Sequence, residues 1–437
     1  MKKINICIAG LGNVGTSLIN SLASSKENIK LKSNIEINIL AVSAKNKNKK
    51  RDCDISSFKW FDNPLDLLSV KNCDVLVELI GNEKGTSYEL VKSALENKIN
   101  VVSGNKAMIA LHGSELFNIA DKNNVLFLYE AAVAGGIPII KTIKDNLFTN
   151  KIKKISGILN GTTNYILSTM QQDNLSFDEV LKIAKSKGYT SDQESNLDIG
   201  GLDASHKLTI LSTISFGAHL DFNINETTGI ADIKIQDIKY ADQLGYRIKL
   251  ISETSVIDGK LYAVTSPKLI NKNNPIANVN GALNAISIET DQLENLFLEG
   301  EGAGGKPTAC SVISDIYQIA TNSSNYSLGF KSIDLKKFEK FDTLNLESNY
   351  YLRIMTKDIP GVLSKITNYF NESNISVEKI LQIPDKNNEI IPIIISTHKV
   401  KKNALMIGNL RLTTSPYLSS IDPYFMPTFC AIYWEFH

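Results

Sequence analysis

In the first third of the chain, short apolar runs alternate with stretches whose apolar residues recur at helical spacing. The apolar runs are rich in β-branched residues, which predicts buried strands. The predicted strands are residues 4–9, 35–42, 74–79, 100–102 and 125–129. Strands that alternate with helices in this way predict an α/β fold with a Rossmann-type, doubly wound parallel sheet, and we assign it to residues 1–132.

From residue 151 the pattern changes and predicts an α+β substrate domain over residues 133–305. Its strand at 151–158 runs through a Gly-Thr-Thr-Asn turn into a helix, and a long helix is expected from Leu202 to about Phe216. Three further strand-like runs lie near 230–235, 247–252 and 260–264. A helix at about 306–322 is expected to return and pack on the first domain.

The rest of the chain predicts a linker and a small third domain. Residues 323–348 are rich in Asn, Ser and Lys, which is typical of a linker. Residues 349–437 begin with a strand, a helix and a strand, followed by a further strand at 388–397. After about residue 400 a glycine and three prolines interrupt the pattern, so the end of this domain is atypical.

Composition narrows the class of protein. The 437 residues are 43% hydrophobic and 21% charged, with a formal net charge of +1, so no global field attracts nucleic acid or an anionic membrane. The basic run at 45–51 also lacks the interleaved aromatics of a nucleic-acid site. Five dispersed cysteines predict reduced thiols in a cytoplasmic protein. No apolar run reaches the roughly 18 residues that a membrane span needs.

A glycine-rich turn follows the first predicted strand. The turn reads Gly10, Leu11, Gly12, Asn13, Val14, Gly15, which fits G-x-G-x-x-G, and a helical pattern follows it. In this context the glycines allow a tight turn and let a pyrophosphate approach the free N–H groups of the helix. The segment predicts a dinucleotide-binding site.

The end of the second strand suggests which dinucleotide. A site for NAD usually carries an acid there, whereas this strand ends in Ser43 and is followed by Lys45, three more lysines and Arg51. The absence of an acidic residue and the presence of several basic residues favour NADP, because its 2′-phosphate needs hydrogen-bond donors and cations. NAD stays possible, because the same residues could form an ordinary basic surface loop.

Candidate catalytic residues cluster in residues 188–208, a polar loop that leads into the long helix. Asp203, His206 and Lys207 lie within one helical turn, so Asp203 can reach both of the others. A surface ion pair would have the same spacing. The other acids of the loop are Asp192, Glu194 and Asp198.

Two further positions lie beyond predicted strand ends, where α/β sheets bind ligands. Lys106 follows the strand at 100–102, and it is either a surface lysine or part of a site. Glu130 precedes a run of small residues whose backbone carbonyls could bind a hard cation, or which could act as a hinge.

Several of these segments, in this order, resemble homoserine dehydrogenases over residues 1 to about 400. The matching motifs are ELIG from Glu78, SGNKA around Lys106, EAAVAGGIPI from Glu130, LNGTTNYIL from Leu159, D-x-x-G-x-D-x-x-x-K ending at Lys207, and GAG-x-x-PTA from Gly302. The third domain resembles an ACT domain, a βαββαβ amino-acid sensor.

The resemblance implies NAD(P)H-dependent interconversion of L-aspartate 4-semialdehyde and L-homoserine. It implies that Lys207 donates the proton, that Lys106 lines the site beside the nicotinamide, and that Asp203 orients Lys207. Gly302 would contact the cofactor. An acid should bind the substrate ammonium: Asp192 stands where the family has Glu, Glu194 is the other candidate, and Asp198 supports them.

The resemblance also implies partners and ions. A structural monovalent cation such as Na⁺ would be held by Glu130 and the carbonyls of Val133, Gly135 and Ile137. Family members are homo-oligomers that dimerise through the substrate domain, and their ACT domain can bind an amino-acid effector such as threonine. Two other functions stay open: a non-catalytic NADP and amino-acid sensor, which would need neither lysine, and a dehydrogenase of another small amino-acid aldehyde.

Overall fold

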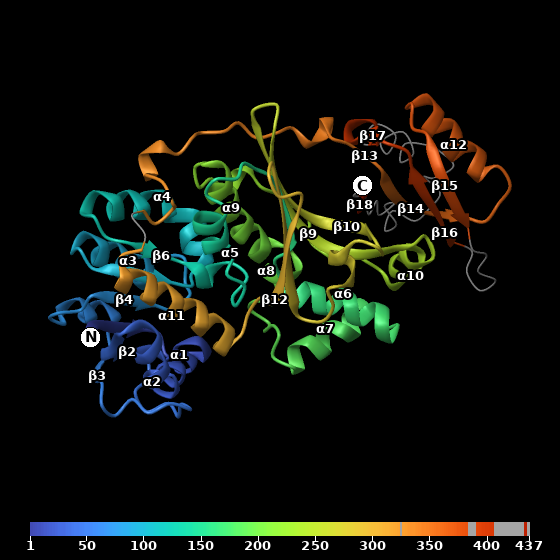
Figure 1. Cartoon of the computed structure of the whole chain (residues 1–437). Coiled ribbons are helices and arrows are strands. Elements are labelled where there is room, and N and C mark those ends of the chain that lie inside the picture. The colour runs from blue at the N-terminus through green and yellow to red at the C-terminus, as the bar shows by residue number, and fades with distance from the viewer. Residues whose placement is uncertain (324–325, 383–389, 406–431, 435–437) are drawn as a thin grey trace.

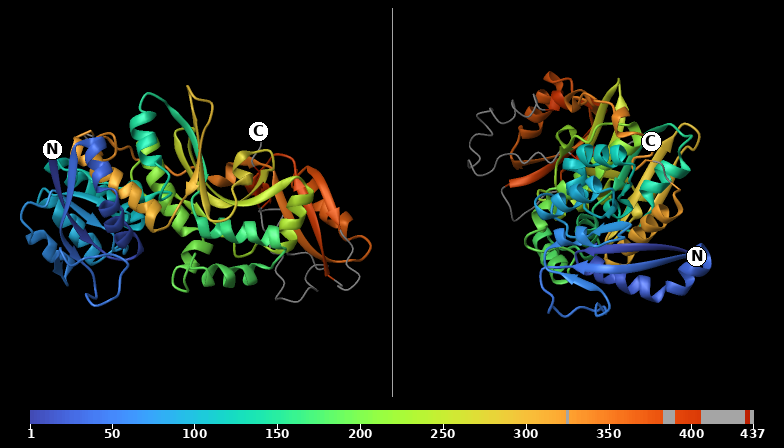
Figure 2. Two further views of the ribbon diagram at one scale, coloured as in Figure 1. Left: turned by 60° about the horizontal axis from the view of Figure 1, so that its bottom comes forward. Right: turned by 90° about the vertical axis from the view of Figure 1, so that its left-hand side faces the viewer.

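The computed structural model describes residues 1–323, 326–382, 390–405 and 432–434. The molecule is elongated, with the N-terminal domain at one end, the C-terminal module at the other and the substrate domain between them (Figures 1 and 2). Within the described ranges, no helix has both the length and the apolar character required to cross a membrane.

The N-terminal domain contains a six-stranded parallel sheet in the order β3-β2-β1-β4-β5-β6. Its strands are β1 (Lys2–Ala9), β2 (Ile35–Ser43), β3 (Lys59–Phe61), β4 (Val75–Glu78), β5 (Asn100–Ser103) and β6 (Phe127–Leu128). Its helices are α1 (Asn13–Ser24), α2 (Lys26–Ser33), α3 (Thr86–Glu96) and α4 (Lys106–Asn123), with a 3-10 turn, η1, at Pro64–Ser69. The parallel doubly wound sheet is as predicted, and β3 is an added edge strand.

Successive side chains of β1 point to opposite faces of this sheet. Ile6 and Ile8 pack with α1, and Cys7 and Ala9 pack with α3 and α4. The face under α1 is completed from far along the chain, by α11 (Gly305–Thr321), whose Val312 and Ile316 lie in the same cluster as Ile6.

The substrate domain is built on a mostly antiparallel sheet. It contains β7 (Ile152–Ile158), β8 (Glu226–Thr227), β9 (Tyr246–Ile257), β10 (Lys260–Asn271), β11 (Leu283–Thr290) and β12 (Leu296–Glu301). Its helices are α5 (Ile139–Lys141), α6 (Gly161–Asp173), α7 (Phe177–Ser186), α8 (Ser195–Ile199), α9 (Leu202–Phe216) and α10 (Ile235–Gln243). Short turns are η2 (Glu130–Ala132), η3 (Thr142–Asn146), η4 (Phe222–Ile224) and η5 (Pro275–Asn278).

The predicted strand at 230–235 is wrong. Ile230 and Ile233 are buried as strand residues would be, but the backbone here is a loop that leads into α10. The Asp237 carboxylate accepts a hydrogen bond from the N–H of Lys234 at 2.9 Å, and this cap begins a helix where the apolar run alone had indicated a strand.

The C-terminal module extends the substrate-domain sheet. Its elements are β13 (Glu347–Ser348), β14 (Tyr350–Lys357), α12 (Val362–Glu372), β15 (Val377–Gln382), β16 (Ile390–Thr397), β17 (Val400–Lys401) and β18 (Ile432–Trp434). β18 pairs with β10 on one side and β14 on the other, so one sheet runs through both parts. The atypical segment after residue 400 falls largely on residues 406–431 and 435–437, outside the described residues.

The described part of the expected linker, residues 326–348, lies extended along the substrate domain, and we call it the strap (Figure 1). It contains η6 (Ser332–Asp334) and η7 (Thr343–Asn345). The N–H of Lys336 donates to the carbonyl of Gly217 at 2.7 Å, and the N–H of Phe341 donates to that of Leu261 at 2.9 Å. Backbone hydrogen bonds therefore fix its path.

A buried carboxylate joins the module to α10. Asp237 Oδ1 accepts hydrogen bonds from the Tyr351 hydroxyl and from Arg353 Nε, both at 2.8 Å, and Asp237 and Arg353 are both buried. Removing one partner of a buried ion pair leaves the other charge uncompensated.

We therefore expect Asp237→Ala to lower the free energy of unfolding by about 3–5 kcal/mol, because Arg353 would stay buried without its carboxylate. Urea denaturation measures the change. Asp232→Ala, at an exposed position five residues earlier, is the control and should leave the midpoint unchanged. Equal midpoints for the two variants would contradict the role given to Asp237.

Candidate active site

Helix α9 carries the central acid–lysine pair on its first two turns. It begins after Gly201, which has the left-handed φ of 80° that favours glycine. Lys207 Nζ lies 2.7 Å from Asp203 Oδ2 and 2.7 Å from the carbonyl oxygen of Leu159. Lys207 is only 8% exposed, so the pair is an interior feature of the site and differs from the surface ion pair that its spacing also allowed.

The second lysine comes from the other domain. Lys106 is the first residue of α4, directly beyond β5, and its Nζ lies 3.1 Å from Asp203 Oδ1. Its side chain is 42% exposed, so it reaches solvent where the two domains meet. Attraction to Asp203 raises the pKa of Lys106, with smaller contributions from Asp198 and Glu194.

Asp203 therefore lies between two ammonium groups. Burial alone would raise the pKa of Asp203, but Lys207, Lys106 and the donor Asn160 together hold it well below its usual range. Burial and repulsion from Asp203 raise the pKa of Asp198. The site thus keeps one carboxylate ionised and a second one closer to protonation.

Asn160 connects these two carboxylates, and the sequence analysis missed it. Its Nδ2 donates to Asp198 Oδ1 at 2.8 Å and to Asp203 Oδ2 at 2.9 Å, while its Oδ1 accepts from the N–H of Thr163 as the N-cap of α6. The Thr190 hydroxyl donates to the other oxygen of Asp198 at 2.8 Å. An Asn placed between a strand and a helix was the available signal, because it is a preferred N-cap.

The two acids expected at the substrate ammonium lie apart from this cluster. The Asp192 side chain is 92% exposed and forms an ion pair with Lys185 at 2.7 Å. Glu194 is also exposed and accepts a hydrogen bond from the Ser191 hydroxyl at 3.2 Å. His206 does not join the cluster by hydrogen bonding; its ring stacks on Phe222 at 4.6 Å, and burial lowers its pKa.

Another buried acid fixes the backbone at the start of α4, where Lys106 lies. Glu78, at the end of β4, accepts hydrogen bonds from the hydroxyls of Ser87 and Ser103 at 2.7 and 2.6 Å. Ser103 in turn accepts from the N–H of Asn105, the N-cap of α4. Glu78 lay in the quoted ELIG motif, but a side chain that acts through three others gives no local signal in the sequence.

The glycine turn borders a cavity of about 770 Å³ whose lining includes Gly10, Gly12, Ser43, Lys45 and Arg51. A side chain at Gly10, where φ is +102°, would bring Cβ to 2.4 Å from the carbonyl oxygen of Leu79, whereas Gly12 has open space beside it. The Ser43 hydroxyl is buried without a hydrogen-bond partner among the described residues. These features fit a bound dinucleotide, which would pass over Gly12 and supply a partner to Ser43.

Asn13 and Val14 begin α1, next to this turn. At Gly15 an added Cβ would lie 2.1 Å from the carbonyl oxygen of Gly10, so only glycine fits there. Gly302 lies elsewhere, against Asn284 and the turn at Gly135. It does not line the cavity that contains Gly12.

Glu130 is buried at the junction between the domains. Its carboxylate accepts hydrogen bonds from the N–H groups of Ile140 and Lys141 at 2.8 and 2.9 Å. Its own N–H donates to Asp315, which pairs with the Lys141 side chain at 2.8 Å. Burial and the charge of Asp315 raise the pKa of Glu130 to about 7.

The carbonyls expected to complete a cation site are near Glu130 in sequence but already have partners. Gly135 O accepts from the Ser311 hydroxyl at 2.6 Å, and Ile137 O accepts from the N–H of Ile139 at 2.8 Å. The structure thus gives partners to two of the three expected carbonyls, those of Gly135 and Ile137. Among the described residues, no group of three or more His, Cys, Asp or Glu could hold a metal ion.

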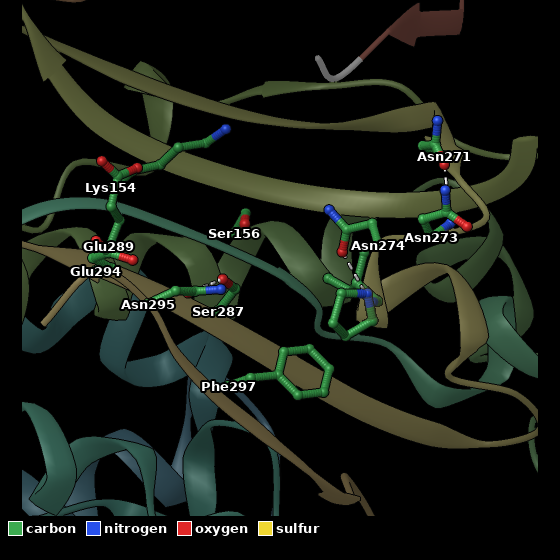
Figure 3. Close-up of a pocket in the computed structure, with 12 residues that line it drawn as sticks. Lys154, Ser156, Asn271, Asn273, Asn274, Ser287, Glu289, Glu294, Asn295 and Phe297 are labelled. Carbon is green, nitrogen blue, oxygen red and sulfur yellow. Dashed lines mark hydrogen bonds between the residues drawn. The ribbon is translucent and has the colours of Figure 1, made fainter. Parts of the chain in front are cut away.

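A separate cavity of about 540 Å³ lies on the open face of the substrate-domain sheet. Figure 3 shows side chains from β7, β11, β12 and the loop after β10 around it, among them Lys154, Glu289 and Phe297. It contains no residue of the lysine cluster. On the same face, the buried carboxylate of Glu253 pairs with Lys154 and Lys268.

Comparisons with known proteins agree along nearly the whole chain. Residues 138–317 match the family described as homoserine dehydrogenase, residues 10–130 match its NAD binding domain, and residues 350–403 match the ACT domain. Homoserine dehydrogenase of Neisseria gonorrhoeae is 38% identical over 405 residues, which are 91% of this chain and 92% of that protein.

Solved structures give the same result. A homoserine dehydrogenase from Thiobacillus denitrificans has a TM-score of 0.90 and 33% identity, covering 99% of this chain and 98% of that one. A hyperthermophilic archaeal homoserine dehydrogenase mutant in complex with NADPH has a TM-score of 0.62 and 28% identity, covering 74% and 99%. Agreement of this extent confirms the family that the motifs predicted: the chain belongs to the homoserine dehydrogenases, oxidoreductases with a nicotinamide-binding domain, here with a C-terminal ACT domain.

Proposed function

We propose that this chain catalyses the NADPH-dependent reduction of L-aspartate 4-semialdehyde to L-homoserine, and the reverse oxidation, within threonine, methionine and isoleucine biosynthesis. The observation that carries the proposal is the Asp203 carboxylate held between Lys207 and Lys106, one from each domain, where the two domains meet. Bound in the neighbouring pocket, a reduced nicotinamide would supply the hydride that reduces the aldehyde carbon.

Lys207 is suited to protonate the oxygen. An ammonium has three N–H donors, and two of those on Lys207 are directed at Asp203 and at the carbonyl of Leu159. The third is available to the aldehyde oxygen, where negative charge develops during reduction. Asp203 also holds Lys106 at 3.1 Å and favours its charged form, so Lys106 can stabilise the same oxygen while Lys207 gives up its proton.

We assign the substrate ammonium to Asp198 and Glu194. Asp198 is bonded into the cluster through Asn160, and Glu194 stands four residues before it, at the N-cap of α8, where its charge makes a small contribution to the raised pKa of Lys106. Asp192 is directed at Lys185 instead. This favours Glu194 over Asp192 as the acid that completes the site.

For the cofactor we propose NADP over NAD. The strand β2 ends in Ser43 without an acid, and Lys45, Lys49 and Arg51 line the same cavity. Arg51 is held over the Trp60 ring at 5.4 Å, so its charge is directed to one place. A 2′-phosphate would find cations there, whereas the end of β2 offers no carboxylate to the ribose hydroxyls of NAD. Asp62, which also lines the cavity, accepts a hydrogen bond from the Trp60 indole at 2.8 Å.

We further propose that this chain works as a homo-oligomer in the cytoplasm and that its ACT domain binds an amino-acid effector. The support for an oligomer is the open sheet face of Figure 3, where Lys154, Glu289 and Phe297 line an accessible cavity. Light scattering of the purified chain would measure the assembly, and a monomer at all concentrations would contradict it.

The decisive experiment is oxidation of NADPH with L-aspartate 4-semialdehyde, in wild type and Lys207→Ala. We expect the variant to lose about 100-fold or more in kcat, because a general acid contributes about that much, while the Kd for NADPH stays unchanged. NADH, tested in parallel, should have a higher KM. A wild-type protein that binds NADPH but turns nothing over would refute the proposal.

Glu194→Gln and Asp192→Asn form a matched pair that tests the ammonium site. We expect Glu194→Gln to raise the KM for the amino-acid substrate about tenfold, since a hydrogen bond to a charged group contributes about 1.5–3 kcal/mol. Asp192→Asn should leave KM within about twofold. The opposite ranking would return the role to Asp192.

A cation at Glu130 is the remaining part of the proposal, supported by the two buried carboxylates of Glu130 and Asp315: the Lys141 ammonium pairs with Asp315, whereas Glu130 accepts the backbone N–H of Lys141. We expect Na⁺ or K⁺ to raise the melting temperature of the wild type by about 2–4 °C relative to choline chloride at equal ionic strength. Glu130→Gln should abolish the difference. Equal melting temperatures in the three salts would argue against a bound cation.

A further inference from the structure

The short strand β8 lies against the helix that carries Asp203 and Lys207. Asn225, just before the strand, donates from Nδ2 to the carbonyl of Ser205 and to the Thr209 hydroxyl, both at 2.8 Å. The Thr227 hydroxyl donates to that of Ser205 at 2.9 Å. These contacts hold the first two turns of α9, the part that bears the acid–lysine pair.

The same segment also fixes the turn before α9. The N–H of Ile230 donates to the carbonyl of Ile199 at 2.9 Å. At Gly201 an added Cβ would lie 3.1 Å from Thr227 Cγ2, so the turn is packed directly on β8. A displacement of β8 would therefore move the start of α9, and with it the Asp203 carboxylate.

Glu226, between Asn225 and Thr227, is directed the other way, as alternation along a strand requires. One of its carboxylate oxygens lies 2.5 Å from Lys402 Nζ, and the other accepts a hydrogen bond from the Thr343 hydroxyl. Burial alone would raise the pKa of Glu226, but Lys402 and Thr343 lower it, so the carboxylate stays ionised.

Thr343 and Lys402 belong to two different segments, one in the strap and one in the C-terminal module. Thr343 begins η7 in the strap, and Lys402 follows β17 of the module. The segments are joined to each other, because β13 pairs with β17 and the N–H of Lys402 donates to the carbonyl of Leu346 at 3.2 Å. Glu226 thus binds the module where it meets the strap.

We propose that Glu226 is a positioning residue that couples the C-terminal module to the catalytic helix. Module and strap hold its carboxylate, β8 transmits their position, and Asn225 and Thr227 set the first turns of α9. The inference rests on the proposed function, since it gives Asp203 and Lys207 on α9 the chemical step. Glu226 lies outside the acid–lysine cluster, yet it controls the geometry of that cluster.

Three variants cut the connection at different points without touching α9: Glu226→Gln, Thr343→Val and Lys402→Met. Glu339→Gln is the matched control, because Glu339 also lies in the strap and pairs with Lys260 at 3.0 Å, but its side chain is 80% exposed. Each full-length protein is measured for kcat and KM with the aldehyde, for NADPH Kd, for melting temperature, and for amide exchange at residues 201–207.

We expect the three variants to lower kcat by about 3- to 30-fold, as residues that couple two sites without contacting either ligand do. NADPH Kd and melting temperature should match those of Glu339→Gln, and exchange at residues 201–207 should become faster. The Glu226→Gln/Lys402→Met double variant should be no slower than Glu226→Gln alone, since both changes break one connection.

Unchanged kcat and exchange in all three variants would overturn the proposal. So would a loss of kcat that only follows the melting temperature, because Glu226 would then act through stability. A wild type that does not reduce the aldehyde would count against the proposed function alone. In that case exchange at residues 201–207 decides the coupling: faster than in Glu339→Gln supports it, and equal rates refute it.

Discussion

The arrangement of the whole site depends on one buried carboxylate. Asp203 attracts one ammonium from its own helix and another from the nucleotide-binding domain. The charge that orients Lys207 therefore also holds Lys106 across the domain boundary. A buried carboxylate is costly unless it is paired and hydrogen-bonded, and Asp203 meets that condition with two lysines and Asn160. Electrostatic compensation and catalytic geometry therefore have the same physical origin here.

Surrounding contacts limit how this charge can move. Asn160 fixes Asp203 to the start of α6, and the network from Glu78 fixes the start of α4 beneath Lys106. Both helices begin at an asparagine N-cap. Lys106 extends from one of these capped starts, and Asn160 at the other holds the partner of Lys207, so the distances between charged atoms follow from backbone positions as much as from side-chain rotamers.

The sequence predicted features that depend on local pattern. The glycine turn after β1, the parallel sheet and the spacing of Asp203 and Lys207 each follow from neighbours within one turn or one strand. The same reasoning failed at residues 230–235, where Asp237 caps a helix inside an apolar run. It also gave no role to Asn160 or Glu78, because Asp198 and Asp203 lie 38 and 43 residues from Asn160, and Ser103 lies 25 residues from Glu78.

Between Asp192 and Glu194 the sequence could not decide, because the choice depends on where Lys185 of α7 lies in space.

The return of α11 to the first domain has a consequence for biosynthesis of the chain. The apolar face formed by Ile6, Ile8 and α1 is covered by residues 305–321, so it stays incomplete on the ribosome until the entire substrate domain has been translated. The nucleotide-binding half then cannot mature as an independent N-terminal unit. Its final assembly follows the translation of the central domain, and nascent chains expose that apolar face to chaperones for most of their synthesis.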